Sequence, residues 1–175
     1  DRKLGYLPEA MRNYLARLGW SHGDEEIFST DQMVDWFSLE ALNKGAARFD
    51  FVKLESVNGH YIRLADPVRL YDIMVATAAE NDRTADVAGL KANRDTVLEA
   101  LPELQPRAKT ILELIDLAQF IYVVRPLVIE PAAAQQLTPE TRLLLKQFGS
   151  IAGDLPEWSV AALDAAARSF GKPGA

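Results

Sequence analysis

The sequence predicts an all-α protein, and three observations support this. Apolar residues recur at the spacing of one helix face along most of the chain, first in the segment 7–18. Proline stands at or near the start of several such segments, where a helix tolerates it. The only β-branched stretch that resembles a strand, 122–129, is interrupted by Arg125 and Pro126. We therefore expect a helical bundle or array.

The first helices are predicted by apolar stripes and by capping residues. Ser29 followed by Gln32 forms the pattern of a capping box, so a helix is expected from Thr30 through Phe37. A further helix is expected from about Asp50 to Arg63. In the segment 7–18, the stripe comprises Leu7, Met11, Tyr14, Leu15 and Leu18, with Arg12, Asn13 and Arg17 on the other side.

The later helices begin at similar local signals. Asp66 and Pro67 form the N-cap and first-turn pair of a helix that carries Leu70 and Met74. Apolar spacing then predicts four more helices, at about 85–101, 106–123, 138–148 and 156–170. Aromatic residues, Phe49 and Trp158 among them, recur beside these stripes, and we expect core packing rather than base stacking for most of them.

Composition excludes several classes of protein. Hydrophobic residues make up 49% and charged residues 25% of the 175 residues, which is ordinary for a folded globular protein. The absence of cysteine excludes disulfides, thiolate zinc sites and cysteine nucleophiles, and a cytoplasmic protein is expected. The longest apolar run, near 118–124, is far shorter than the roughly 20 residues of a membrane span. Because the first residue is Asp1 and not methionine, we expect a fragment.

The sequence offers no catalytic or metal site. It contains no glycine-rich phosphate loop, no paired-histidine zinc helix and no nucleophile elbow. His22 and His60 lie in separate segments without ligand spacing, so no metal is expected. The acidic pair Glu25 and Glu26 lies in a polar loop, where solvated carboxylates are the common case. We therefore expect no catalytic residue in this chain.

Clustered cations are the feature that points to function. A helix that began at Pro106 would place Arg107 and Lys109 in its first turn, where free N–H groups and the macrodipole favour anions. A phosphate or a base edge would then be the partner, and a solvated arginine is the alternative. Arg142 and Lys146 share a helix face at i,i+4 spacing, although such a pair is more often simply solvated. Similar spacing relates Lys91 to Arg94 and Arg168 to Lys172, so that a basic stripe would form if the helices aligned.

Four segments resemble the glutamyl-tRNA synthetases of the bacterial type, which are class I enzymes. The most specific is GYLPEAMRNYLARLGWSHGDEEIFS at residues 5–29, followed by FDFVKLESVNGHYIR at 49–63. Weaker matches are LPELQPRAKTILEL at 101–114 and EWSVAALDAAARSF at 157–170. The chain departs from the family pattern at Ser56, where tryptophan is usual.

The resemblance implies the carboxy-terminal, tRNA- and anticodon-binding region of such an enzyme, truncated at both ends. Residues 1–63 would form a helical unit that adjoins the catalytic domain and contacts the tRNA stem. Residues 64–175 would form an anticodon-binding helical domain that is incomplete at its carboxy-terminal end. The fragment would need no cofactor and would be inactive alone, whereas the intact ligase joins glutamate to its tRNA using ATP with magnesium in the missing catalytic domain.

The resemblance also implies which residues contact tRNA. Arg107 matches an arginine that lies near the third anticodon base in the family, and Lys109 follows it in the same segment. Lys53 and Asn58 belong to the second matching segment and are assigned to the tRNA-contacting surface. Arg142 and Lys146 are assigned to the same surface from their shared helix face, not from a matching segment. The partner would be glutamate tRNA or, in relaxed members, also glutamine tRNA, and the fragment would be a monomer without a membrane contact. The alternative is a helical protein-interaction module derived from a synthetase paralogue, which the net charge of −6 would suit.

Overall fold

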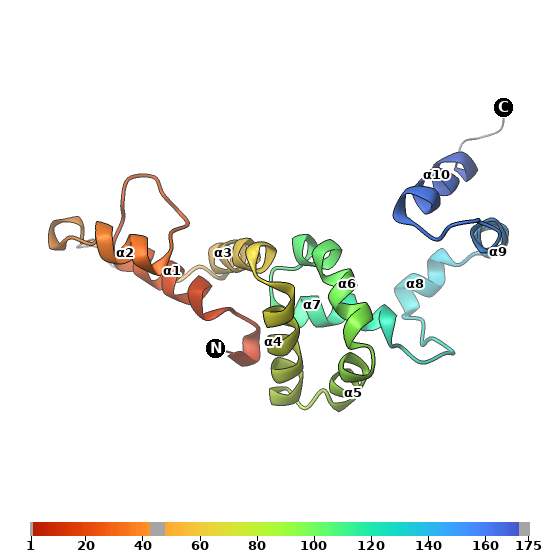
Figure 1. The fold of residues 1–175 in the computed structure, drawn as a ribbon, viewed down its shortest axis with the longest axis horizontal. Coiled ribbons are helices and arrows are strands. Elements are labelled where there is room, and N and C mark those ends of the chain that lie inside the picture. Colours follow the sequence, from red (N-terminus) through yellow and green to blue (C-terminus); the bar gives the residue numbers. More distant parts are fainter. Residues whose placement is uncertain (1, 43–47, 172–175) are drawn as a thin grey trace. The chain divides into compact units, whose positions relative to one another are not determined.

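The computed structural model describes residues 2–42 and 48–171 (Figure 1). In these residues every regular element is a helix, and the only strand-like pairing is an isolated antiparallel bridge between Trp20 and Leu42. The all-α prediction is therefore confirmed. The α-helices are α1 Pro8–Gly19, α2 Thr30–Trp36, α3 Phe51–Leu64, α4 Pro67–Glu80, α5 Thr84–Ala92, α6 Arg94–Leu104, α7 Ile111–Ala118, α8 Pro131–Gln136, α9 Pro139–Gly153 and α10 Val160–Phe170. The short 3-10 helices are η1 Arg2–Leu4, η2 Leu39–Ala41, η3 Gln105–Arg107 and η4 Gln119–Ile121.

The chain forms two compact units, residues 1–124 and residues 125–175. We call them the first unit and the second unit. The first unit contains α1 to α7, and the second contains α8 to α10. The domain division predicted between residues 63 and 64 concerns function rather than compactness, and it stays a prediction.

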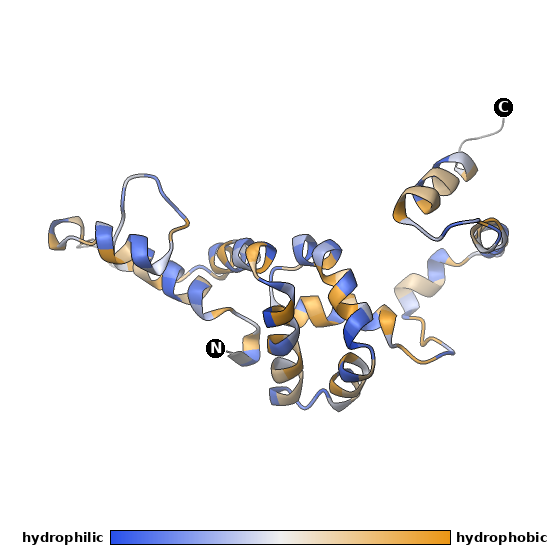
Figure 2. Ribbon diagram, in the orientation of Figure 1, coloured by the Kyte–Doolittle hydropathy of each residue, from blue (hydrophilic) through white to orange (hydrophobic). Residues whose placement is uncertain are grey.

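The core of the first unit is built around α7. Four of its apolar residues recur at helical spacing and are buried, while Leu112 and Leu117 are partly buried. The buried four are Ile111, Leu114, Ile115 and Ala118. Figure 2 shows this helix as one of the most hydrophobic stretches of the unit. The same core includes buried residues of α3, α4, α5 and α6, so these helices pack as one body. The further members of this core are Leu7, Ala10, Val57, Ile62, Leu70, Tyr71, Met74, Ala78, Leu90, Val97, Leu101, Leu104 and Ala108.

The buried face of α1 differs from the predicted stripe. Leu15 is 49% exposed, whereas Asn13, which was expected on the polar side, is completely buried. The Asn13 side chain donates to the carbonyl of Glu26 at 3.0 Å and accepts from the N–H of Phe28 at 3.1 Å. A buried amide whose hydrogen bonds are satisfied is stable in the interior. Asn13 therefore holds the long loop between α1 and α2 against α1.

The predicted helix starts are confirmed where they depend on neighbouring residues. Ser29 and Gln32 form both hydrogen bonds of the capping box of α2, at 3.1 and 2.8 Å. Asp66 accepts a hydrogen bond from the N–H of Arg69 at 2.8 Å, and Pro67 is the first residue of α4. The predicted helix from Asp50 is α3.

Three of the other predicted boundaries are wrong. The helix expected at 85–101 is two helices, α5 and α6, with the break at Asn93. The backbone N–H and the side chain of Asn93 both donate to the carbonyl of Gly89, at 3.1 and 2.9 Å, and so cap the end of α5. The helix expected at 138–148 continues to Gly153. The helix expected at 156–170 begins at Val160, because Ser159 caps it.

The second unit packs sparsely. The rings of Phe148 on α9 and Phe170 on α10 lie 5.6 Å apart, which joins these two helices. Among the described residues of the unit only Ala152 is buried. The helices of this unit therefore depend largely on their own caps, such as Thr138, which accepts from the N–H of Thr141 at 3.2 Å.

Candidate nucleic-acid interface

Asn58 is part of the scaffold beneath the predicted interface. It lies on α3 and is completely buried. Its Oδ1 accepts from the N–H of Leu7 at 2.7 Å, and its Nδ2 donates to the carbonyls of Gly5 at 3.3 Å and Lys109 at 2.6 Å. These bonds use both donors and the acceptor of the amide. The prediction that Asn58 contacts tRNA is therefore wrong, since the side chain instead holds the segment around Lys109 against α3.

Gln105 fixes the same segment at a second point. It is buried, and its Nε2 donates to the carbonyls of Ile62 at 2.7 Å and Ala65 at 3.0 Å, at the carboxy-terminal end of α3. Arg107 belongs to the same 3-10 helix and is exposed. No hydrogen bond or ion pair of its side chain occurs within residues 2–42 and 48–171. Its backbone is therefore held in place while its guanidinium group is available to a partner.

Arg63 lies beside this segment, close to Gly59. A Cβ atom at Gly59 would be 3.4 Å from the carbonyl oxygen of Ala108 and 3.7 Å from Nη1 of Arg63. The backbone of the segment and the Arg63 guanidinium group therefore both approach the same point on α3. We call Arg63, Arg107 and Lys109 together the Arg107 surface. Arg63 was not selected from the sequence, where only its place at the end of the second matching segment marked it.

The helix predicted to begin at Pro106 is wrong. The 3-10 helix η3 occupies that position, and α7 begins only after a cap at Thr110. The Thr110 hydroxyl accepts from the N–H of Glu113 at 3.2 Å, and the Glu113 carboxylate accepts from the N–H of Lys109 at 2.7 Å. Arg107 and Lys109 therefore both precede the cap, and neither lies in the first turn of an α-helix. The argument that a macrodipole draws an anion to them does not hold.

The start of α7 is occupied by the protein itself. The carbonyl of Gly5 accepts from the N–H of Ile111 at 2.9 Å. Gly5 has a φ of +79°, and a Cβ there would lie 2.9 Å from the backbone nitrogens of Ile111 and Leu112, so only glycine fits. An anion has no place at this helix start, so a nucleic-acid contact in this segment would have to use side chains.

Lys53 belongs to a second candidate surface in the first unit. It lines a cavity of about 770 Å³ together with Arg48, Phe49 and Phe51. The two phenylalanine rings lie 4.9 Å apart and are 41% and 59% exposed. The core packing expected for most aromatic residues therefore does not apply to Phe49, nor to Trp158, which is 71% exposed. Exposed rings beside cations are the combination that unpaired bases bind. We call Arg48, Phe49, Phe51 and Lys53 the Lys53 surface.

The acidic groups near the Lys53 surface already have partners. Glu26 forms an ion pair with Arg17 at 2.9 Å. The Asp50 carboxylate caps α3, accepting from the N–H groups of Val52 at 2.9 Å and Lys53 at 3.2 Å. The ammonium group of Lys53 forms no ion pair within the described residues. Its charge therefore remains available to an anion.

The cations predicted in the second unit lie on the exposed helix α9. Arg142 donates from Nε to the carbonyl of Leu137 at 2.9 Å, and Lys146 is exposed one turn later. On α10, Arg168 pairs with Asp164 at 2.8 Å. Its predicted partner in spacing, Lys172, lies outside the described residues. The basic stripe stays a prediction.

The other predicted pair, Lys91 and Arg94, does not share a helix face, because α5 ends between them. The Arg94 guanidinium group instead lies 5.4 Å from the centre of the Tyr71 ring.

In the described part of the chain no three acidic, histidine or cysteine side chains gather as metal ligands would. His22 stacks on Trp36 with ring centres 4.4 Å apart. Within the same residues, no helix has the length and apolarity to cross a membrane.

Comparison with known proteins identifies the family. Residues 64–173 match the anticodon binding domain. The chain belongs to the anticodon-binding domain family. Residues 2–56 match the catalytic domain of the class I tRNA synthetases for E and Q, of which the chain holds only a small part. The resemblance predicted from the sequence is thereby confirmed.

Relatives of this chain are named as glutamate–tRNA ligases. Glutamate–tRNA ligase 1 of Brucella melitensis and glutamate–tRNA ligase 2 of Brucella ovis are each 48% identical to it over 170 residues, or 96% of the chain. The chain spans 36% of each of them. A glutamate tRNA ligase from Elizabethkingia meningosepticum, solved in complex with its amino acid, has a TM-score of 0.71 at 25% identity, covering 95% of this chain and 32% of its own. The synthetase from Elizabethkingia anophelis, at 23% identity and a TM-score of 0.70, shares the fold.

The two matches divide the candidate surfaces. The Lys53 surface lies within the stretch that matches the synthetase catalytic domain. Arg107, Lys109, Arg142 and Lys146 all lie within the anticodon-binding domain. The anticodon-binding domain therefore carries most of the cations that were selected from the sequence.

Proposed function

We propose that this chain is the anticodon-side, tRNA-binding part of a glutamate–tRNA ligase. In the whole ligase, ATP and magnesium would serve the catalytic domain, which joins glutamate to its tRNA. This chain would hold the anticodon arm so that the acceptor end of the tRNA meets that domain. It would act in the cytoplasm as a single copy and would not aminoacylate tRNA alone.

The proposal rests on how the structure presents the side chain of Arg107. Buried Asn58 and Gln105 hold the segment that carries it, and its guanidinium group has no partner among residues 2–42 and 48–171. A planar guanidinium group on a fixed backbone can donate two parallel hydrogen bonds to one base edge. In a domain of the anticodon-binding family, the base edge that suits it belongs to the anticodon.

The remaining cations would contact phosphates. Arg63 and Lys109 flank Arg107, Lys53 lies on the second surface, and Arg142 and Lys146 lie on α9. Phosphate contacts fix the register of an RNA without reading its sequence. Because the net charge of the chain is −6, these local clusters must supply the attraction.

The test is a titration of labelled glutamate tRNA, glutamine tRNA and an unrelated tRNA against the chain and its Arg107→Ala variant, at two salt concentrations. We expect the substitution to weaken binding of the preferred tRNA by about 1–3 kcal/mol, the range of one bidentate base contact. The loss should persist at both salt concentrations, whereas phosphate contacts weaken as salt rises.

Lys91→Ala is the matched control. Lys91 is exposed on α5, beyond the opposite end of the 11-residue helix α6, which is about 16 Å long. Removing its charge should leave the preference among the three tRNAs unchanged. Equal binding of all three tRNAs by the unaltered chain, or no binding even at low salt, would reject the proposal for the isolated chain.

A protein-interaction module is the second candidate, and one observation favours it. The second unit leaves Leu143, Leu144 and Leu145 more than half exposed on consecutive positions of α9. Apolar side chains exposed in this way are typical of an interaction surface. The same titration separates the two functions, because a protein-interaction module would show no salt-dependent binding of tRNA.

A further inference from the structure

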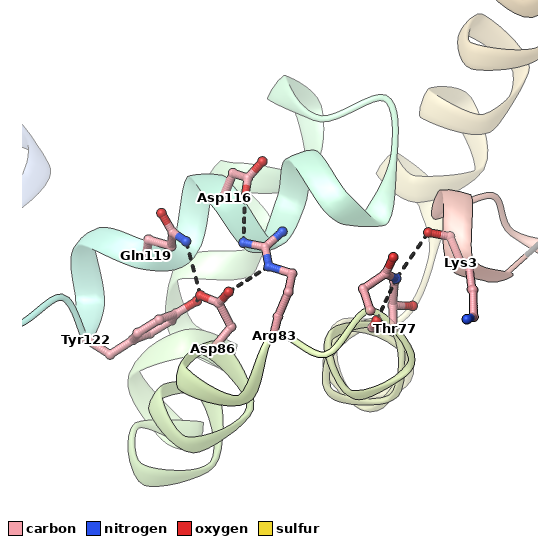
Figure 3. Close-up of polar contacts among 8 residues, drawn as sticks. Lys3, Thr77, Arg83, Asp86, Asp116, Gln119 and Tyr122 are labelled. Atoms are coloured by element: carbon pink, nitrogen blue, oxygen red, sulfur yellow. Dashed lines mark hydrogen bonds and ion pairs between the residues drawn. The ribbon is translucent and has the colours of Figure 1, made fainter. Parts of the chain in front are cut away.

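A buried carboxylate on α5 accepts hydrogen bonds from the last segment of the first unit. Asp86 is only 8% exposed and accepts three hydrogen bonds: from Nε of Arg83 at 2.6 Å, from the hydroxyl of Tyr122 at 2.8 Å and from Nε2 of Gln119 at 3.1 Å (Figure 3). Two of these donors lie in the segment that follows α7. A single carboxylate thus joins α5 to the last residues of the unit.

Arg83 extends the network to a third element. Its Nη2 donates to Asp116 on α7 at 2.6 Å, while its Nε holds Asp86. Burial acts to raise the pKa of Asp86, but the hydrogen bonds from Tyr122, Arg83 and Gln119 outweigh it and leave that pKa below its ordinary value. Burial and the Asp86 carboxylate raise the pKa of Tyr122, so its hydroxyl remains a donor at neutral pH. The network is therefore charged and fully formed under ordinary conditions.

Gly89 provides the space for the Tyr122 ring. A Cβ atom at residue 89 would overlap the Cδ2, Cγ and Cε2 atoms of that ring. The ring therefore packs directly on the backbone of α5, one turn after Asp86. Both ends of the Tyr122 side chain are thus determined, the ring by Gly89 and the hydroxyl by Asp86.

This arrangement stands directly before the boundary between the two units. Tyr122 donates its N–H to the carbonyl of Gln119 at 3.1 Å, and Val123 donates to the same carbonyl at 2.8 Å. The first unit ends at Val124, and the second begins at Arg125. The described contacts therefore fix the chain up to the point at which it leaves the first unit.

We propose that Asp86, Gly89 and Tyr122 form a clamp that fixes the exit of the chain from the first unit, so that the second unit can add its cations to RNA binding. The part of this inference that concerns RNA rests on the proposed function. Asp86 and Tyr122 are positioning residues in it: they touch no RNA and act through Arg142 and Lys146.

Hydrogen exchange tests the clamp itself. Gly89→Ala removes the space for the ring, and Tyr122→Phe keeps the ring but removes the bond to Asp86. We expect the amide of Val123 to exchange at least about tenfold faster in both variants, since local opening of this segment becomes easier. Gly19→Ala is the matched control, because a Cβ at Gly19 meets no atom within 4 Å. Unchanged exchange at Val123 in both clamp variants would overturn the inference.

A double-mutant cycle tests the consequence for RNA. Arg142→Ala and Arg107→Ala are each measured for tRNA affinity in the unaltered chain and in the Gly89→Ala and Tyr122→Phe backgrounds. We expect the loss caused by Arg142→Ala to shrink by at least about twofold when the clamp is broken, while the loss caused by Arg107→Ala stays the same. A clamp that merely stabilised the whole fold would reduce both losses together.

The outcomes separate this inference from the proposed function. If the unaltered chain binds no tRNA, the proposed function fails, and exchange at Val123 alone decides whether the clamp exists. If tRNA binds and the Arg142→Ala loss is the same in all backgrounds, the clamp does not affect what the second unit contributes to RNA binding, and the inference is overturned. Circular dichroism of each variant confirms that its helices are intact.

Discussion

The first and second units hold their cations in different ways. In the first unit, Arg107 is carried by a segment that the buried side chains of Asn58 and Gln105 fix to α3. In the second, Arg142 and Lys146 lie on α9, an exposed helix whose unit buries only Ala152 among its described residues. One unit thus offers a fixed donor, and the other offers charge on a sparsely packed helix.

This difference matches two kinds of RNA contact. Reading a base requires donors at fixed positions, because a misplaced guanidinium group loses one of its two hydrogen bonds to the base edge. A phosphate contact depends on charge and tolerates a less exact position. On the proposed function, the first unit would therefore supply preference among tRNAs, and the second would supply affinity.

The largest expected effect concerns packing. Leu114→Ala should destabilise the first unit by about 2–5 kcal/mol, because Leu114 is completely buried on α7 and its truncation leaves a cavity. Leu144→Ala should cost about 0.5 kcal/mol or less, because Leu144 is 52% exposed on α9. Urea unfolding followed by circular dichroism measures both. Similar losses in the two variants would show that α9 is packed in solution, and the contrast between the units would disappear.

The next effect concerns the polar scaffold. Asn58→Ala should cost about 2–4 kcal/mol, because it leaves the buried N–H of Leu7 and the carbonyl of Lys109 without partners. Asn81→Ala is the matched control: its side chain is partly exposed, donates to the carbonyls of Lys3 and Thr77 (Figure 3), and should cost about 1 kcal/mol. Unfolding in urea gives both values, and equal costs would contradict the scaffold role of Asn58.

The sequence predicted the features that depend on near neighbours. The caps at Ser29 and Asp66 act over three residues, so their residue types alone indicate the helix starts. The all-α class follows in the same way from periodicity. Arg107 was selected by a resemblance and by a local charge argument, and the charge argument is the part that fails, since the cap at Thr110 places α7 after it.

The sequence could not predict the features that depend on distant residues. Asn58 bonds to Leu7 and to Lys109, each 51 positions away, and Gln105 bonds to Ile62 at 43 positions. An asparagine in a helix has the same local pattern whether it faces water or holds two other segments, so Asn58 was assigned to the surface. Gly89 likewise carries no local sign that the Tyr122 ring packs on it.

The smallest expected effect is a pH dependence that also differs between the units. The pKa of Asp86 in the folded first unit lies below its ordinary value of about 3.9, so the stability it contributes is fully present above that value and is lost as the pH falls through the lower, folded pKa. In Asp86→Asn this contribution is absent at every pH. The fall in unfolding free energy between pH 7 and pH 3 should therefore be smaller in the variant, by on the order of 1 kcal/mol, the scale of one charged hydrogen bond.

Glu140 provides the comparison in the second unit. Hydrogen bonds from its own backbone and from Thr138 lower its pKa as well, but its carboxylate is fully exposed on α9, where water solvates either form. Glu140→Gln should therefore leave the pH dependence unchanged. Glu9, whose pKa is also lowered through its bonds to Arg69, titrates in every variant and does not affect the difference. An equal change in Glu140→Gln and Asp86→Asn would mean that burial of the Asp86 network adds nothing to the first unit.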